Sequence, residues 1–129
     1  MKILIAYDKN TSISNVLEKG VERAKADGAY VYLVRTCSAD RKIEELSELE
    51  EQMNQIKNDV FDKEGIACET HLLIRGVAPG EDIVRYAKQK EVDEIIIGIK
   101  KRSKIGKMVF GSNAQYIILE AHCPVLTVK

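Results

Sequence analysis

Five short apolar runs are spaced along the chain, and polar residues or glycines separate them. They cover residues 3–7, 30–34, 72–74, 95–97 and 125–128. Because successive positions within each run are apolar, both faces of such a strand would be buried, which is typical of a sheet covered by helices on both sides. The pattern therefore predicts five buried strands.

The segments between these strands repeat their apolar residues at three-and-four spacing, which is typical of amphipathic helices. The first helix is expected to end at Gly28, and the second, over roughly residues 41–64, to end at Gly65. Pro79 begins the third helix. The apolar stripes are Ile13, Val16, Leu17, Val21 and Ala24; Ile43, Leu46, Leu49, Met53, Ile56 and Val60; Ile83, Val84 and Ala87; and Ala114, Ile117, Ile118 and Ala121. The second helix is charged outside its stripe, so we interpret it as a solvated cover helix.

The elements alternate as strand and helix four times and close with a strand. This order predicts an α/β fold with an open, parallel, five-stranded sheet and helices on both faces, joined by right-handed crossovers. We expect a Rossmann-like sheet with strand order 3-2-1-4-5. In such folds the ligand lies at the carboxyl ends of the strands, so the segments that follow the strands are the candidates for binding.

Length and charge narrow the possible functions. The 129 residues predict a single domain spanning 1–129, and the 20 basic and 20 acidic side chains cancel. No field of the whole molecule therefore favours nucleic acid or an anionic membrane as a partner. The apolar runs are too short to span a membrane and no signal peptide pattern is present, so we expect a cytoplasmic protein. Three cysteines without metal-binding spacing predict buried thiols.

The stretch between Glu94 and Asn113 gives the strongest indication of function. An apolar strand ends at Gly98, a basic loop follows, and Gly111-Ser112 opens the last helix. Backbone amides in such a segment converge where the helix dipole is positive, which favours an anion. The loop adds a local cluster of cations: Lys100, Lys101, Arg102, Lys104 and Lys107. The stretch therefore predicts a site for a di- or triphosphate, with a solvated basic loop as the alternative.

A helix cap and two known nucleotide-binding motifs are alternative interpretations of parts of the sequence. Ser112 heads a capping-box pattern, so a plain helix cap explains that serine as well as a ligand does. A Walker A loop is excluded because Lys101 and Met108 stand where it requires a glycine and a serine or threonine. The first strand–helix turn has no glycine, so a dinucleotide fingerprint is also absent.

Asp8 is a second candidate, because it follows the first strand at the same edge of the predicted sheet. Its carboxylate suits an adenine amine or a ribose hydroxyl, or it caps the turn into the first helix. A phosphoacceptor role is rejected because the third strand ends in Arg75-Gly76 rather than in a second acid. His71 and His122 have neither metal nor triad spacing. The sequence therefore predicts binding residues but no catalytic residue and no metal ligand.

Over its whole length the chain resembles the universal stress protein family. The matching features are the strand that ends in Asp8, Gly76-Val77-Ala-Pro79 with Ile83, Glu94-Ile-Ile-Ile-Gly98, and Gly111-Ser112 followed by Cys123-Pro124-Val-Leu-Thr-Val128. ATP-binding members carry glycine, two residues, glycine, nine residues, glycine, and then serine or threonine. Lys101 replaces the middle glycine here and places a side chain where the backbone would approach the phosphates. Lys101 either supplies a cation to the phosphates or marks a variant that does not hold ATP.

The resemblance implies an adenine-nucleotide site, with ATP as the cofactor, alone or with Mg²⁺. It places Asp8 near the adenine and ribose, Thr36 near the adenine, Val77 in the base pocket, and Asn113 beside Ser112 at the ribose and phosphates. The complete set of predicted site residues is Asp8, Thr36, Val77, Gly98, Lys101, Gly111, Ser112 and Asn113.

The resemblance also implies a homodimer, and an apolar last strand at the edge of the sheet supports this independently, because such edges are usually paired or covered. We interpret the chain as a cytoplasmic, homodimeric, nucleotide-binding sensor or regulator in the stress response rather than an enzyme. The alternative is a dimeric interaction module of the same fold that does not bind nucleotide. Slow ATP hydrolysis is a third possibility, although no general base or dedicated metal carboxylate is evident.

Overall fold

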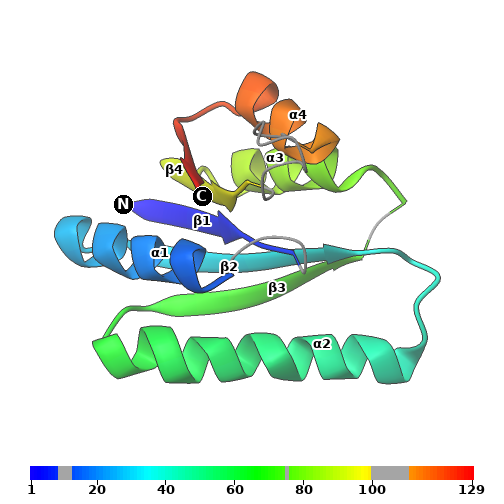
Figure 1. The fold of residues 1–129 in the computed structure, drawn as a ribbon, viewed down its shortest axis with the longest axis horizontal. Coiled ribbons are helices and arrows are strands. Elements are labelled where there is room, and N and C mark those ends of the chain that lie inside the picture. The colour runs from blue at the N-terminus through cyan, green and yellow to red at the C-terminus, as the bar shows by residue number, and fades with distance from the viewer. Residues whose placement is uncertain (9–12, 75, 100–110) are drawn as a thin grey trace, which may run out of the picture.

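The computed structural model describes residues 1–8, 13–74, 76–99 and 111–129. Within these residues the chain forms a parallel five-stranded sheet (Figure 1) with strand order β3-β2-β1-β4-β5. The predicted α/β fold and strand order are confirmed. The strands are β1 (Lys2–Ala6), β2 (Tyr30–Cys37), β3 (Cys68–Ile74), β4 (Glu94–Gly98) and β5 (Val125–Val128), and every neighbouring pair is parallel.

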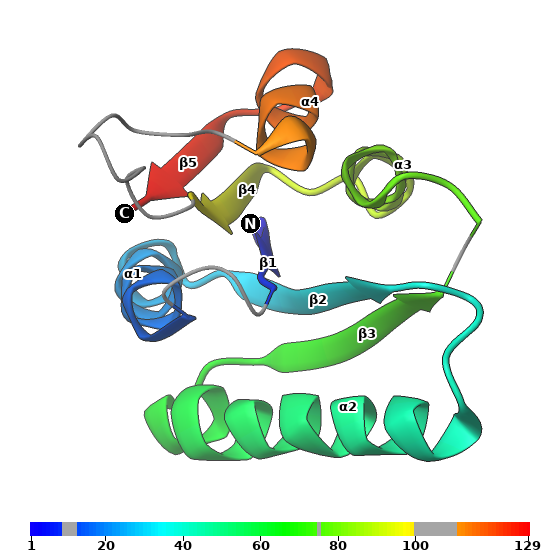
Figure 2. The same cartoon turned by 45° about the vertical axis from the view of Figure 1, so that its right-hand side comes forward.

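Helices cover both faces of the sheet. They are α1 (Ile13–Asp27), α2 (Ile43–Ile56), α3 (Pro79–Gln89) and α4 (Ser112–Glu120). The helices α1 and α2 lie on one face and α3 and α4 on the other, as the two views in Figures 1 and 2 show. Among the described residues, no helix is long and apolar enough to cross a membrane.

Strand β1 lies at the centre of the sheet and contributes to both apolar cores. Ile3 and Ile5 pack under α1 and α2, whereas Leu4 packs under α3, and all three side chains are fully buried. Burying a side chain of this size contributes about 1.5–3 kcal/mol. Because both faces of β1 are buried, successive residues of this strand are apolar.

Two helical segments end at the glycines that the sequence predicted as their stops, Gly28 and Gly65. Gly28 and Gly65 have φ values of 61° and 70°, the left-handed conformation that commonly terminates a helix. The segment before Gly65 differs from the prediction of one regular helix, because α2 ends at Ile56 and continues as a π-helical turn, Lys57–Phe61, and a 3-10 turn, Asp62–Glu64. The wider π turn changes which side chains face the sheet.

The apolar stripe of this segment is therefore only partly as predicted. Leu49 and Met53 are buried, but Ile43 is 78% exposed. Phe61 in the π turn is fully buried, although the predicted stripe ended at Val60, which is only partly buried. Ile43 is the first residue of α2.

The three cysteines are free thiols. Cys68 at the start of β3 is buried, whereas Cys37 and Cys123 are half-buried, so the prediction of buried thiols is right for Cys68 alone. Burial raises the pKa of the Cys68 thiol from its ordinary value of 9.0 to about 12.

We expect the stability of the protein to fall as the pH rises above 9.0 toward about 12, partly because of Cys68. The folded pKa lies above the unfolded pKa, so the unfolded chain loses the thiol proton first and is stabilised relative to the folded chain as the pH rises. One such group contributes about 1.4 kcal/mol per pH unit within that window. Unfolding free energies measured across the window should decline less steeply for Cys68→Ala than for the wild type, and equal slopes would contradict the assignment.

Candidate functional site

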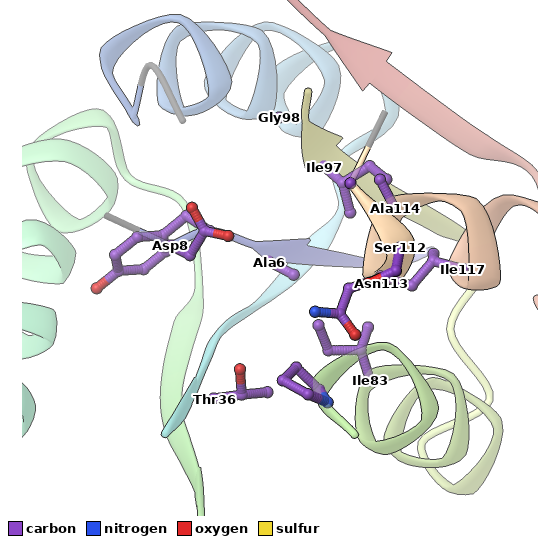
Figure 3. Close-up of a pocket in the computed structure, with 13 residues that line it drawn as sticks. Ala6, Asp8, Thr36, Ile83, Ile97, Gly98, Ser112, Asn113, Ala114 and Ile117 are labelled. Carbon is purple, nitrogen blue, oxygen red and sulfur yellow. The ribbon is translucent and has the colours of Figure 1, made fainter. Parts of the chain in front are cut away.

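A cavity of about 160 Å³ opens at the carboxyl edge of the sheet. It lies at the ends of the neighbouring strands β1 and β4. Here the strand order reverses, because β2 and β3 are added beside β1 on one side and β5 beside β4 on the other. Doubly wound folds bind their ligands at this kind of position. The lining residues (Figure 3) are Ala6, Tyr7, Asp8, Thr36, Pro79, Ile83, Ile97, Gly98, Gly111, Ser112, Asn113, Ala114 and Ile117.

Two helices begin at this cavity. Pro79 is the first residue of α3 and Ser112 the first residue of α4, and both line the cavity. The first-turn amides of a helix have no partner within the helix, and the dipole there is positive. The start of α4 therefore offers amides to an anion or another hydrogen-bond acceptor, and the positive end of the α3 dipole lies beside it.

The start of α4 differs by one residue from the capping-box interpretation. Gly111 is the N-cap residue, with φ −66° and ψ 158°, and Ser112 already belongs to the helix. The side chain of Ser112 is therefore not the N-cap of α4. It lines the cavity and is exposed there.

Most of the predicted site residues meet at the cavity. The residues brought together are Asp8, Thr36, Gly98, Gly111, Ser112 and Asn113. Val77 lines an adjoining cavity instead. Lys101 and the other cations of the basic loop lie outside the described residues.

The adjoining cavity has a volume of about 470 Å³ and shares Thr36 and Pro79 with the first. Its remaining lining residues are Cys37, Ser38, Ala39, Asp40, Gly76, Val77 and Asp82. The Ser38 hydroxyl lies 2.5 Å from the Asp40 carboxylate, and this hydrogen bond lowers the pKa of Asp40. Burial raises the pKa of Cys37. This side of the site therefore offers the Asp40 carboxylate as a hydrogen-bond acceptor for donors on a ligand, beside a Cys37 thiol that stays protonated.

Tyr7 and Asp8 stand side by side at the end of β1 but differ in environment. Asp8 is exposed, whereas Tyr7 is buried. Burial raises the pKa of Tyr7, and the nearby Arg35 guanidinium partly offsets that effect. Arg35 lies over the Tyr7 ring, with its guanidinium carbon 5.7 Å from the ring centroid. Tyr7 is thus a neutral phenol. Among the described residues that line the first cavity, Asp8 is the acidic side chain.

The described residues do not group three or more histidine, cysteine or acidic side chains in a way that would hold a metal ion. The chemistry that the described residues support is binding by hydrogen bonds, by helix-start amides and by apolar contact. The apolar wall was not predicted as part of the site. It consists of Ala6, Pro79, Ile83, Ile97, Ala114 and Ile117. Pro79 and Ile83 had a signal in the sequence, because both belong to the segment that follows the third strand and matches the family pattern.

Comparisons with known proteins place these features in context. The sequence model of the universal stress protein family matches residues 1–129. A universal stress protein of Methanocaldococcus jannaschii is 29% identical over 141 residues, which cover 99% of this chain and 81% of that protein.

Two solved structures extend the comparison. A universal stress protein from Archaeoglobus fulgidus is 39% identical, with a TM-score of 0.86 over 100% of this chain and 98% of that one. A structure of the universal stress protein from Archaeoglobus fulgidus in complex with dAMP is 33% identical, with a TM-score of 0.81 over 100% and 98% of the two chains.

Proposed function

The chain belongs to the universal stress protein family, and on that premise we propose that it binds an adenine nucleotide at the carboxyl edge of its sheet. The observation that carries the proposal is the cavity where Asp8 and Thr36 face the start of α4. A nucleotide matches both sides, because its base and sugar offer hydrogen-bond donors and its phosphate suits helix-start amides. The Archaeoglobus fulgidus relative in complex with dAMP supports this class of ligand.

The proposed roles follow from position. Asp8 and Thr36 contact the ribose and adenine, and Val77 with the adjoining cavity contacts the base. Gly98 and Gly111 leave room for the phosphates to approach the backbone, and Ser112 binds them with its hydroxyl and amide. By the family resemblance, Lys101, which lies outside the described residues, is proposed to supply a cation to the phosphates. ATP, with or without Mg²⁺, is the proposed physiological ligand.

The direct test is to identify what the protein carries. Protein purified rapidly at low salt is denatured, and the released small molecules are analysed by mass spectrometry. We expect an adenine nucleotide at a substantial fraction of the protein concentration. Protein that carries none, and that takes none up from a mixture of AMP, ADP and ATP, would favour the dimeric interaction module that does not bind nucleotide.

We propose that the bound nucleotide is a signal rather than a substrate, and that the protein acts as a sensor or regulator in the cytoplasm. Groups that bind a phosphate without a positioned general base stabilise the ground state and not a transition state. Phosphate release from ATP should therefore stay below about 1 per second, the low end of ordinary enzymes. Sustained multiple turnover above that rate would show that a catalytic group exists in this site.

We further propose a homodimer formed through β5. Among the described residues β5 pairs with β4 on one side, and its other edge has no strand beside it. The carbonyl oxygen of Pro124 accepts a hydrogen bond from the Ile95 N–H of β4 at 3.0 Å, and that of Val128 accepts one at 2.9 Å from the N–H of Ile99, the residue after β4. The main-chain groups of the alternate residues Val125 and Thr127 therefore face the open edge. An open apolar edge of this kind is usually paired or covered, and a second copy of β5 fits it.

Thr127→Pro should convert the dimer to a monomer, because proline removes a main-chain donor at the open edge and keeps the bonds to β4. Thr127 is exposed, so Thr127→Val serves as a control that changes the side chain and retains the donor. Sedimentation velocity at several protein concentrations distinguishes the two states. A proline variant that sediments as a dimer, or a wild type that sediments as a monomer, would contradict this interface.

A further inference from the structure

Helices α3 and α4 begin side by side, and their first turns are joined by one hydrogen bond. The Gly80 amide N–H donates to Oδ1 of Asn113 over 2.9 Å, although the two residues are 33 positions apart. Gly80 is the second residue of α3, so its N–H has no acceptor within the helix. The N-cap residue Ala78 has only a methyl side chain, and Pro79 has no N–H. Asn113 thus supplies the cap of α3 from another helix.

The missing side chain of Gly80 makes this contact possible. A Cβ atom at that position would lie 2.9 Å from the backbone oxygen of Asn113 and 3.1 Å from its Cα. Backbone atoms cannot turn aside as the end of a flexible side chain can, so any larger residue would push the two helix starts apart. Gly80 does not have a positive φ. The glycine is needed here for close approach and not for its backbone conformation.

The bond to Gly80 also determines how the Asn113 amide faces the cavity. Its oxygen is held toward α3, so the NH₂ group, with two donors, is on the other side. Figure 3 shows this group directed into the cavity, toward Asp8 and Thr36. The amide cannot turn its oxygen to the cavity without leaving the Gly80 N–H unpaired, which is unfavourable for a part-buried group. The cavity wall is therefore a fixed donor at this point.

We propose that Asn113 is a positioning residue, and that the Gly80–Asn113 contact, here called the helix clasp, sets the phosphate affinity of the site. The clasp holds the first turn of α4 against α3 and so directs the first-turn amides of α4 at the phosphate oxygens of the ligand. This inference rests on the proposed nucleotide function. It adds that the phosphate part of the affinity depends on α3, a helix for which the sequence predicted no phosphate ligand.

Asn113 could act only as a cap that stabilises α3, or as a clasp that positions α4. A rescue variant distinguishes these two roles. Asn113→Ala removes the clasp. Adding Ala78→Ser to it gives α3 a local N-cap, which restores the stability of that helix but does not tie it to α4. We expect the double variant to regain thermal stability while its affinity for dAMP stays about tenfold or more below that of the wild type, the effect of losing one hydrogen bond to a charged group.

Deoxyadenosine provides the matched ligand, because it lacks only the phosphate. Its affinity should fall less than that of dAMP in the double variant, so that the preference for dAMP over deoxyadenosine collapses. Recovery of dAMP affinity by Ala78→Ser, or equal losses for dAMP and deoxyadenosine, would overturn the clasp. Gly80→Ala, which keeps the Asn113 side chain and separates the helices, should lose dAMP affinity in the same way.

Hydrogen exchange of the Gly80 amide, measured by NMR without ligand, tests the contact independently of binding. The Gly80 amide should be protected in the wild type and in Asn113→Asp, which keeps an acceptor, and should exchange rapidly in Asn113→Ala. Rapid exchange in the wild type would overturn the inference alone. A wild type with a protected Gly80 that fails to bind dAMP would instead overturn the proposed function on which the inference rests.

Discussion

Replacement of Gly111 by valine is expected to abolish nucleotide binding and leave the fold intact. Gly111 has φ −66° and ψ 158°, which any residue adopts, so the substitution introduces no backbone strain. Gly111 lines the cavity at the start of α4, and a branched side chain there would occupy space that a phosphate needs to reach the first-turn amides. We expect at least a 100-fold loss of dAMP affinity, which corresponds to about 2.7 kcal/mol.

Calorimetric titration measures that loss, and circular dichroism with thermal melting tests whether the fold persists. Gly111→Ala is the graded control, because its methyl group fills less of the cavity, and its loss should be smaller. A Gly111→Val protein that binds dAMP as tightly as the wild type would show that the ligand does not approach the start of α4.

Phe61→Ala is expected to cause the largest loss of stability, about 3–5 kcal/mol. Phe61 is fully buried and packs in the same core as Met53 and Val31, on the face of the sheet covered by α1 and α2. Its removal leaves a cavity that the surrounding strands cannot fill. Chemical denaturation measures the free energy of unfolding, and Val60→Ala, at the half-buried neighbouring position, should lose less.

Nucleotide binding by the folded fraction of Phe61→Ala should be retained, because the residue is not part of the cavity lining. If Phe61→Ala and Val60→Ala lost the same small amount of stability, the π-helical turn would not direct Phe61 into the core as described.

The strands show how far the sequence alone predicts this fold. The runs for β1 and β4 were predicted within about a residue, because central strands of a parallel sheet are apolar on both faces. Strand β3 was predicted over 72–74 only, and the structure extends it to Cys68–Ile74. As an edge strand it carries half-buried polar residues such as Glu69 and His71, and a continuous apolar run does not reveal such a strand.

The helices were less predictable in their details. Among the predicted stripe residues of α4, Ile117 is buried, but Ile118 is 40% exposed. A short apolar helix allows more than one face, and only packing against α3 decides which one is buried. The π-helical turn after α2 likewise depends on the fit of Phe61 into the core and has no local signal in the sequence.

The candidate site was predicted largely from chain topology. Asp8, Gly98 and Gly111-Ser112 were expected at one edge because each lies where a strand ends or a helix begins, and the structure places all of them at one cavity. The contact between Gly80 and Asn113 was not predictable in this way. It joins residues on two helices whose relative placement only the packed structure determines.

The cavity at the carboxyl edge is proposed to bind an adenine nucleotide through its phosphate as well as its base. Titration of dAMP into the wild-type protein, freed of any ligand that copurifies, tests it most directly. We expect one-to-one binding that is stronger than the binding of deoxyadenosine and that weakens as salt is added. Absence of binding at millimolar dAMP, or equal affinity for dAMP and deoxyadenosine, would contradict it.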